Sequence, residues 1–251
     1  MKHKFLFILL FSLVLEGMVT TQAVAGDYVH QVNTLIGTKG TGLTSGYLYP
    51  GATYPYGMVQ FTPSYFSKRS GFVINQLSGG GCEHMGNFPT FPVKGKLKMS
   101  PDNILNYRIN VSEEKGHAGY YEAMVQEDIK AKLTVTERTG MASYEYPADQ
   151  QYGTIIIGGG ISATPIEQAA IVITAPNKCE GYAEGGNFCG LRTPYKVYFV
   201  AEFDTDAFET GTWKREELMP NTTFAEGEYS GVYFTFDVNK KKNIQYKIGV
   251  S

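Results

Sequence analysis

The chain has 251 residues, 43% of them hydrophobic and 14% aromatic, which suffices for one large or two small domains with a packed core. Its formal net charge of −2 excludes the strongly basic surface that binding to nucleic acid or to an anionic membrane requires. The 29 glycines and 18 tyrosines argue against a helix bundle and favour strands joined by tight turns.

Residues 1–25 have the pattern of a secretory signal peptide. Residues 2–4 form a basic start, residues 5–15 form an apolar run that is short for a bilayer, and the AVA at residues 23–25 fits a cleavage site. A membrane anchor is the alternative interpretation of the apolar run. We therefore expect an exported mature chain, residues 26–251, in the periplasm, at the cell surface or outside the cell, with no membrane attachment after cleavage.

Glycine and threonine dominate residues 37–46 and predict a loop. Such a loop either connects strands across the end of a sandwich or forms a wall that faces a ligand. The connector is the simpler interpretation, because glycine loops mostly turn the chain. Residues 58–61, MVQF, then predict a buried strand.

The segment that follows, residues 76–92, reads QLSGGGCEHMGNFPTFP and has neither a helical nor a strand period. Consecutive glycines are justified where a loop needs positive φ, or where another molecule lies against bare backbone. Glu83, His84 and Asn87 come directly after them and offer polar groups that can bind hydroxyls. The segment is therefore a candidate site. The alternative is a plain Ω-like turn, in which His84 is a neutral histidine bonded to backbone.

From Gly116 onward the sequence predicts a β-meander. Residues 129–135 alternate apolar and polar side chains, as a half-buried strand does, whereas residues 154–157 are too apolar to alternate, as in a strand covered on both faces. Helical stripes do not exceed about two turns in the mature chain, so a sandwich or barrel is expected. We expect Trp213 beside a turn, with a sugar platform as the alternative. The predicted strands are residues 119–126, 129–135, 141–146, 154–157, 170–175, 195–204, 232–238 and 244–250.

Export permits disulfides among the three cysteines. Cys179 and Cys189 flank a glycine-rich stretch that we expect to be a loop, and a disulfide between them would close it. Cys82 with Cys189 is the other pairing, and the sequence leaves both pairings open. Spacing typical of zinc ligands is absent from the sequence. The sequence stops at Ser251, directly after a predicted strand, which indicates a chain that is cut or that continues into another domain.

Six segments, in this order, resemble the N-terminal domain of glycoside hydrolase family 92, the calcium-dependent, exo-acting α-mannosidases. They are VNTLIGT, PGATYPYGMVQFTP, LSGGGC, EKGHAGYYEAMVQEDIKAKLTVTERTGMASYEYP, YKVYFVAEFD and KIGVS. The resemblance covers nearly all of residues 29–251. It implies an all-β fold, an antiparallel β-sandwich of the mutarotase-like supersandwich type, over residues 26–251.

The resemblance also implies a second domain, a larger C-terminal (α/α)6 helical barrel that carries the catalytic groups and is absent from this chain. In the family, a glutamic acid and an aspartate base hydrolyse terminal α-mannosidic linkages with inversion, beside a calcium ion that the helical domain mainly holds. The implied partners are mannose-containing glycans and that helical domain, with no nucleic acid. We expect no calcium in this chain alone, and little or no activity.

Within the resemblance, the loop with the pattern SG-x-GC reaches the leaving-sugar side of the substrate pocket. The chain departs from the family where Asn87 replaces an acid and where residues 73–76 lack histidines that many members carry, so the preferred linkage stays open. Glu83 is a lone acid, and hydrolysis needs two carboxyl groups, so no catalytic residue or metal ligand is assigned. A free-standing carbohydrate-binding sandwich and a purely structural sandwich are the alternative functions. The candidate substrate-binding residues are Ser78, Gly79, Gly80, Gly81, Cys82, Glu83, His84 and Asn87.

Overall fold

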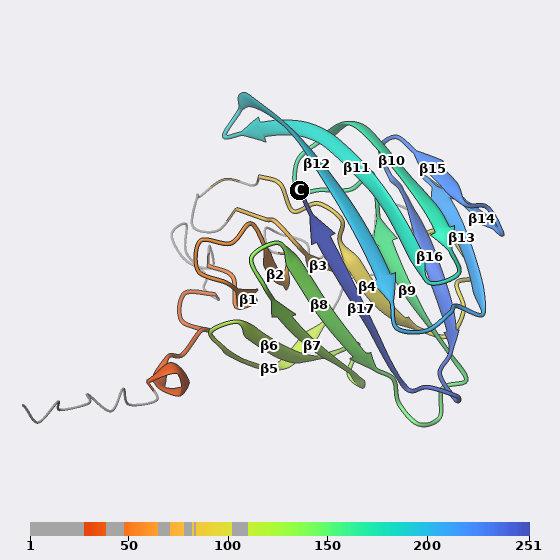
Figure 1. Cartoon of the computed structure of the whole chain (residues 1–251), viewed down its shortest axis with the longest axis horizontal. Helices are drawn as coiled ribbons and strands as arrows, with labels where there is room; N and C mark the ends of the chain where they lie inside the picture. The colour runs from red at the N-terminus through yellow and green to blue at the C-terminus, as the bar shows by residue number, and fades with distance from the viewer. Residues whose placement is uncertain (1–27, 39–47, 65–70, 78–81, 83, 102–109) are drawn as a thin grey trace, which may run out of the picture. The chain divides into compact units, whose positions relative to one another are not determined.

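The computed structural model describes residues 28–38, 48–64, 71–77, 82, 84–101 and 110–251 (Figure 1). The chain divides into two compact units, residues 1–31 and 32–251. The described part of the first unit holds one 3-10 turn, η1 (Val29–Gln31). The predicted signal peptide lies outside the described residues, among which no helix has the length and apolar character needed to span a membrane.

The second unit contains two antiparallel sheets. In the described residues, the first sheet has eight strands, in spatial order β1 (Ala52–Thr53), β2 (Gln60–Pro63), β3 (Phe72–Val73), β4 (Thr90–Lys94), β9 (Tyr152–Gly158), β16 (Ser230–Asp237), β13 (Glu209–Lys214) and β14 (Glu217–Pro220). The second sheet has nine strands, in the order β15 (Phe224–Glu226), β10 (Ile166–Ala175), β11 (Lys178–Phe188), β12 (Leu191–Phe203), β17 (Asn243–Val250), β8 (Thr139–Glu145), β7 (Ile129–Val135), β6 (Tyr120–Val125) and β5 (Val111–His117). The predicted β-sandwich is therefore confirmed.

The core lies between the sheets and is rich in aromatic side chains. The ring of Phe203 on β12 lies 4.7 Å from that of Phe234 on β16, which joins the two layers. Elsewhere, the Tyr246 hydroxyl on β17 donates to Thr90 Oγ1 on β4 at 2.6 Å, and Tyr144 Oη lies 3.2 Å from the same oxygen. Buried hydroxyls are stabilising only when they find such partners, so this cluster helps to fix how the two sheets sit on each other.

Strands with a clear period lie where the sequence predicts them. β7 spans residues 129–135, and Ile129, Ala131 and Leu133 point into the core. β9 contains residues 154–157, a threonine and three isoleucines, which are all buried, as expected for a strand covered on both faces. β17 lies between β12 and β8, in the middle of its sheet.

One prediction was wrong. The glycine-rich stretch after Cys179 is not a loop but strand β11, because its glycines allow close packing: a Cβ at Gly181 would lie 2.3 Å from the Ala170 carbonyl oxygen on β10. Trp213 lies in β13, just before the turn at residues 215–216 as predicted, and its side chain is fully buried. Gly231 on β16 makes room for the indole, since a Cβ there would lie 2.2 Å from the ring.

Candidate functional site

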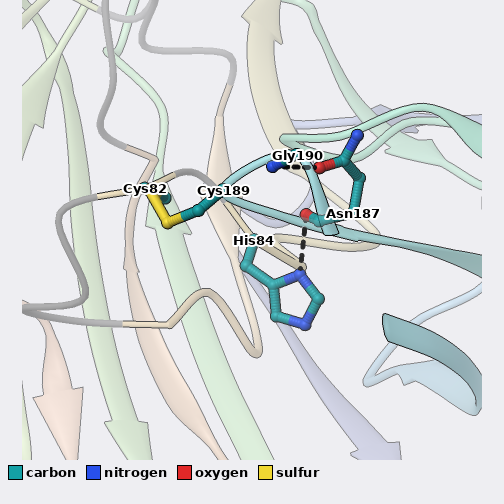
Figure 2. The surroundings of a disulfide bond; sticks show 5 residues. All are labelled: Cys82, His84, Asn187, Cys189 and Gly190. Atoms are coloured by element: carbon teal, nitrogen blue, oxygen red, sulfur yellow. Dashed lines mark hydrogen bonds between the residues drawn. A yellow bond between two sulfur atoms is a disulfide. The ribbon is translucent and has the colours of Figure 1, made fainter. Parts of the chain in front are cut away.

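A disulfide ties the predicted site segment to a hairpin that is distant in sequence. Cys82 bonds to Cys189, across 107 residues of chain and a Cα–Cα distance of 5.4 Å (Figure 2). Of the two pairings that the sequence left open, the structure thus selects this one. Cys179 remains a free thiol in the described chain, and burial raises its pKa, which makes it unreactive.

Cys189 occupies the turn of the β11–β12 hairpin. Phe188 pairs with Leu191, so Cys189 and Gly190 form a two-residue turn, with φ of 52° and 85°. Positive φ at both positions matches the right-handed twist of the flanking strands. Asn187 Oδ1 accepts a hydrogen bond from the Gly190 backbone N–H at 2.9 Å, which helps to fix the turn (Figure 2). The cysteine is therefore held at the tip of a rigid hairpin.

His84 packs on the same hairpin. Its Nδ1 lies 3.1 Å from the Asn187 carbonyl oxygen, and because a carbonyl only accepts, Nδ1 carries the proton (Figure 2). The imidazole also meets the edges of Phe188, at 5.5 Å between ring centroids, and Tyr195, at 5.7 Å. In the neutral ring Nε2 is then an acceptor, and Figure 2 shows it on the side of the ring away from Asn187. The half-buried His84 thus bonds to backbone, as expected for a plain turn, and its Nε2 still offers one hydrogen-bond acceptor.

Asn87 anchors the segment to the protein interior. Its side chain is fully buried: Oδ1 accepts from Asn75 Nδ2 at 3.2 Å, and Nδ2 donates to the Tyr195 hydroxyl at 3.1 Å. The Asn87 backbone N–H donates to Asn75 Oδ1 at 2.8 Å. Asn87 therefore positions the loop, and direct contact with a sugar hydroxyl, as the sequence suggested, would require the loop to open.

The backbone around Asn87 adopts unusual conformations. Met85, Gly86 and Phe88 have φ of 60°, 74° and 53°, in the left-handed region that side chains other than glycine rarely adopt. The Phe88 ring is fully buried and lies 4.2 Å from that of Phe199, which holds the strained residues in place. Such strain persists only where the surroundings determine the conformation, and it is concentrated at functional sites.

The sequence missed Tyr195, which contacts both His84 and Asn87. The only signal was its place at the start of YKVYFVAEFD, one of the six family-like segments. Of the predicted site residues, the structure brings Cys82, His84 and Asn87 together at the β11–β12 hairpin. The others, Ser78, Gly79, Gly80, Gly81 and Glu83, lie outside the described residues.

The described part of the site offers hydrogen-bonding and aromatic groups but lacks a pair of carboxyl groups for hydrolysis. Its members are imidazole, amide, phenol and disulfide groups, without the two carboxyl groups that glycoside hydrolysis needs. Throughout the described ranges, no three His, Cys, Asp or Glu side chains gather closely enough to hold a metal ion. These residues do not fit the calcium ion that the resemblance implies, and we derive no step through it.

Comparison with known proteins relates residues 31–251 to a family model, the glycosyl hydrolase family 92 N-terminal domain. Among solved structures, the fold is similar to the family 92 glycosyl hydrolase ccman5, at 21% identity and a TM-score of 0.76, over 90% of this chain and 32% of that one. It is also similar to a family 92 α-mannosidase from Bacteroides thetaiotaomicron, at 24% identity and a TM-score of 0.74, over 89% of this chain and 33% of that one.

A third relative is a secreted glycosidase of Arthroderma benhamiae, which is 30% identical over 159 residues, 54% of this chain and 20% of that protein. The chain thus spans about a third of the solved structures and a fifth of this relative. At these identities the solved structures establish the fold.

Proposed function

This chain belongs to glycoside hydrolase family 92, as an N-terminal domain, and on that premise we propose that it is the substrate-facing part of an exported α-mannosidase. The enzyme hydrolyses terminal α-mannosidic linkages of glycans with inversion, and a C-terminal helical domain supplies the acid and the base. The names of the solved relatives, α-mannosidase and inverting mannosidase, support this activity. The disulfide and the secreted relative support export.

One observation carries the proposal: the Cys82–Cys189 disulfide and the bonds of His84 and Asn87 hold these three residues on the β11–β12 hairpin before any sugar binds. Preorganised residues lose little entropy on binding, so weak hydroxyl contacts yield useful affinity. In this arrangement His84 Nε2 accepts a hydrogen bond from a hydroxyl of the leaving sugar. Asn87 and Tyr195 keep the imidazole in place and do not touch the substrate.

The test uses the purified chain alone and the chain joined to the helical domain of a solved family 92 α-mannosidase, in place of that enzyme's own N-terminal domain. Substrates are an α-linked mannobiose, whose leaving group is a sugar, and an aryl α-mannoside, whose leaving group is not. We expect no mannose release from the chain alone and release from the joined protein. Release by the chain alone, at a rate close to that of the joined protein, would refute the proposal that the helical domain supplies the acid and the base.

The role of His84 is tested in the joined protein with His84→Ala. We expect KM for mannobiose to rise about tenfold, the worth of one or two hydrogen bonds, with little change for the aryl mannoside. His117→Ala is the matched control, because His117 Nδ1 also lies near a backbone carbonyl, that of Ala118 at 3.0 Å, and its ring also contacts a tyrosine, Tyr120. Equal effects of the two substitutions on mannobiose would contradict the assignment.

The alternative is a free-standing carbohydrate-binding sandwich. The observation that favours it is a core whose largest side chains, such as Trp213 and Tyr246, are fully buried within this chain. It predicts that residues 26–251 form a stable monomer and bind α-mannosides with micromolar Kd without the helical domain. Isothermal titration calorimetry distinguishes the two, because the enzyme-fragment proposal expects such binding only with the helical domain attached.

A further inference from the structure

The outward face of the β11–β12 hairpin carries an ordered series of side-chain pairs. Tyr182 lies directly opposite Tyr198, and Glu184 lies opposite Lys196. The Lys196 ammonium forms an ion pair with Glu184 and also lies 4.3 Å from the centre of the Tyr182 ring. Next along the strands, Glu180 lies opposite Val200. A pair of aromatic rings is thus flanked by charged side chains on both sides.

A shallow groove of about 390 Å³ lies on this face and is lined by residues of β10, β11, β12 and β15. These strands form one half of the nine-stranded sheet (Figure 1). Tyr198 is 49% exposed and Phe224 is 52% exposed, which is unusual for large apolar rings and typical of a binding surface. A small residue, Ala170, lies opposite Tyr182 on β10 and leaves space beside the ring. We name this groove the tyrosine groove; it is lined by Ala170, Val172, Glu180, Tyr182, Tyr198 and Phe224.

The charges around the groove indicate what kind of ligand fits. On the outward faces of β11, β12 and the strands beside them lie four carboxylates, Glu180, Glu184, Glu202 and, on β15, Glu226, and three ammonium groups, Lys178, Lys196 and, on β17, Lys247. A face whose charges nearly cancel attracts neither a polyanion nor a polycation strongly. A protein partner would have to desolvate these charges, which are depleted in the centre of protein interfaces. A neutral ligand with many hydroxyls can instead pack its apolar faces on the aromatic rings and hydrogen-bond to the charged groups.

We propose that the tyrosine groove is a carbohydrate-binding site for neutral pyranose oligosaccharides, a site that does not depend on the proposed hydrolysis. The apolar face of one sugar ring lies on the exposed face of Tyr198, and a neighbouring ring lies on Phe224. The Glu180 carboxylate accepts a hydrogen bond from a sugar hydroxyl. In the described part of the chain, this carboxylate has no other hydrogen bond or ion pair. The Lys196–Glu184 pair keeps Tyr182 in place at the end of the groove.

The experiment is native gel electrophoresis of the full chain in gels that contain a neutral α-mannan, a neutral β-glucan or the polyanion dextran sulfate. We expect retardation by a neutral polysaccharide and none by dextran sulfate. Tyr198→Ala should weaken the retardation about tenfold, as the loss of a central aromatic contact does. Tyr198→Phe keeps the ring and should retain binding, and Glu180→Gln should weaken it about threefold by removing the charge on the acceptor.

The matched control is Phe208→Ala. Phe208 is 58% exposed and also has a lysine over its ring, with Lys96 Nζ at 4.5 Å, but it lies outside the groove. We expect wild-type retardation from this variant, with melting temperatures near the wild type for all variants. The proposal is overturned if neither neutral polysaccharide retards the chain, if Tyr198→Ala behaves like Phe208→Ala, or if dextran sulfate retards it equally. Self-association that Tyr198→Ala abolishes would also overturn it, because the face would then bind protein.

Discussion

Removing the Cys82–Cys189 disulfide tests whether this bond stabilises the whole fold or only orders the loop. The double substitution Cys82→Ser with Cys189→Ser leaves no thiol from the pair to form a wrong disulfide with Cys179. Since the bond closes 107 residues of chain, the chain-entropy model gives a loss of about 4.8 kcal/mol in the free energy of unfolding. For a chain of this size that corresponds to a fall in Tm of about 10–19 °C.

Urea unfolding followed by tryptophan fluorescence measures this loss. The chain has one tryptophan, and Trp213 is fully buried in the eight-stranded sheet, so its emission reports on the core and not on the loop. Reduced wild-type protein should behave like the double variant. Cys179→Ala is the control for loss of a thiol, and it should destabilise by only about 1 kcal/mol because it removes one buried sulfur.

The reasoning predicts a change in the midpoint of unfolding and some change in its slope, since the unfolded chain without the disulfide is more expanded. A loss below about 1 kcal/mol in the double variant would refute it. The disulfide would then only restrain the loop against the hairpin, and the tip of β11–β12 would separate from the loop without unfolding the sandwich.

Three further outcomes follow from the contacts of single residues. Tyr246→Phe should lower the free energy of unfolding by about 1–2 kcal/mol in urea, because Thr90 Oγ1 loses its 2.6 Å donor; an unchanged midpoint would contradict the hydroxyl cluster. Burial of Tyr120, together with its hydrogen bond to the Glu122 carboxylate, raises the pKa of Tyr120 to about 12. The stabilisation by this tyrosine is therefore complete below pH 10 and is lost as the pH rises through about 12. A Tyr120→Phe variant whose stability falls as steeply over that range would refute this. Gly231→Ala should destabilise by about 2–3 kcal/mol, because its Cβ would lie 2.2 Å from the Trp213 ring, whereas at Gly249 the nearest atom would be 3.7 Å away and alanine should be tolerated; thermal melts that rank the two equally would contradict this packing.

The sequence predicted the strands that have a simple period and missed those that do not. β7 alternates, β9 has three consecutive isoleucines, and both patterns follow directly from which faces are covered. β11 was hidden because Gly181, Gly185 and Gly186 look like a loop, although Gly181 serves close packing against β10. Glycine has the same sequence signal whether it permits a turn or a close approach.

The candidate site was only partly predictable for a related reason. The polar residues after the glycines were visible in the sequence, but what each does depends largely on partners more than 100 residues away. His84 bonds to Asn187, and Asn87 bonds to Tyr195, at sequence separations of 103 and 108 residues. Asn87 also bonds to Asn75, 12 residues away, but no sequence pattern announces that pair. The disulfide pairing was equally open until the hairpin placed Cys189 beside Cys82.

The central place of β17 determines when this chain can fold. β17 pairs with β12 on one side and β8 on the other, so residues 139–145 and 191–203 have no shared sheet until residues 243–250 have been synthesised. Contacts over such long separations form slowly, and their apolar faces stay exposed in the meantime. A nascent polypeptide of this design therefore cannot close its nine-stranded sheet until β17 has emerged from the ribosome.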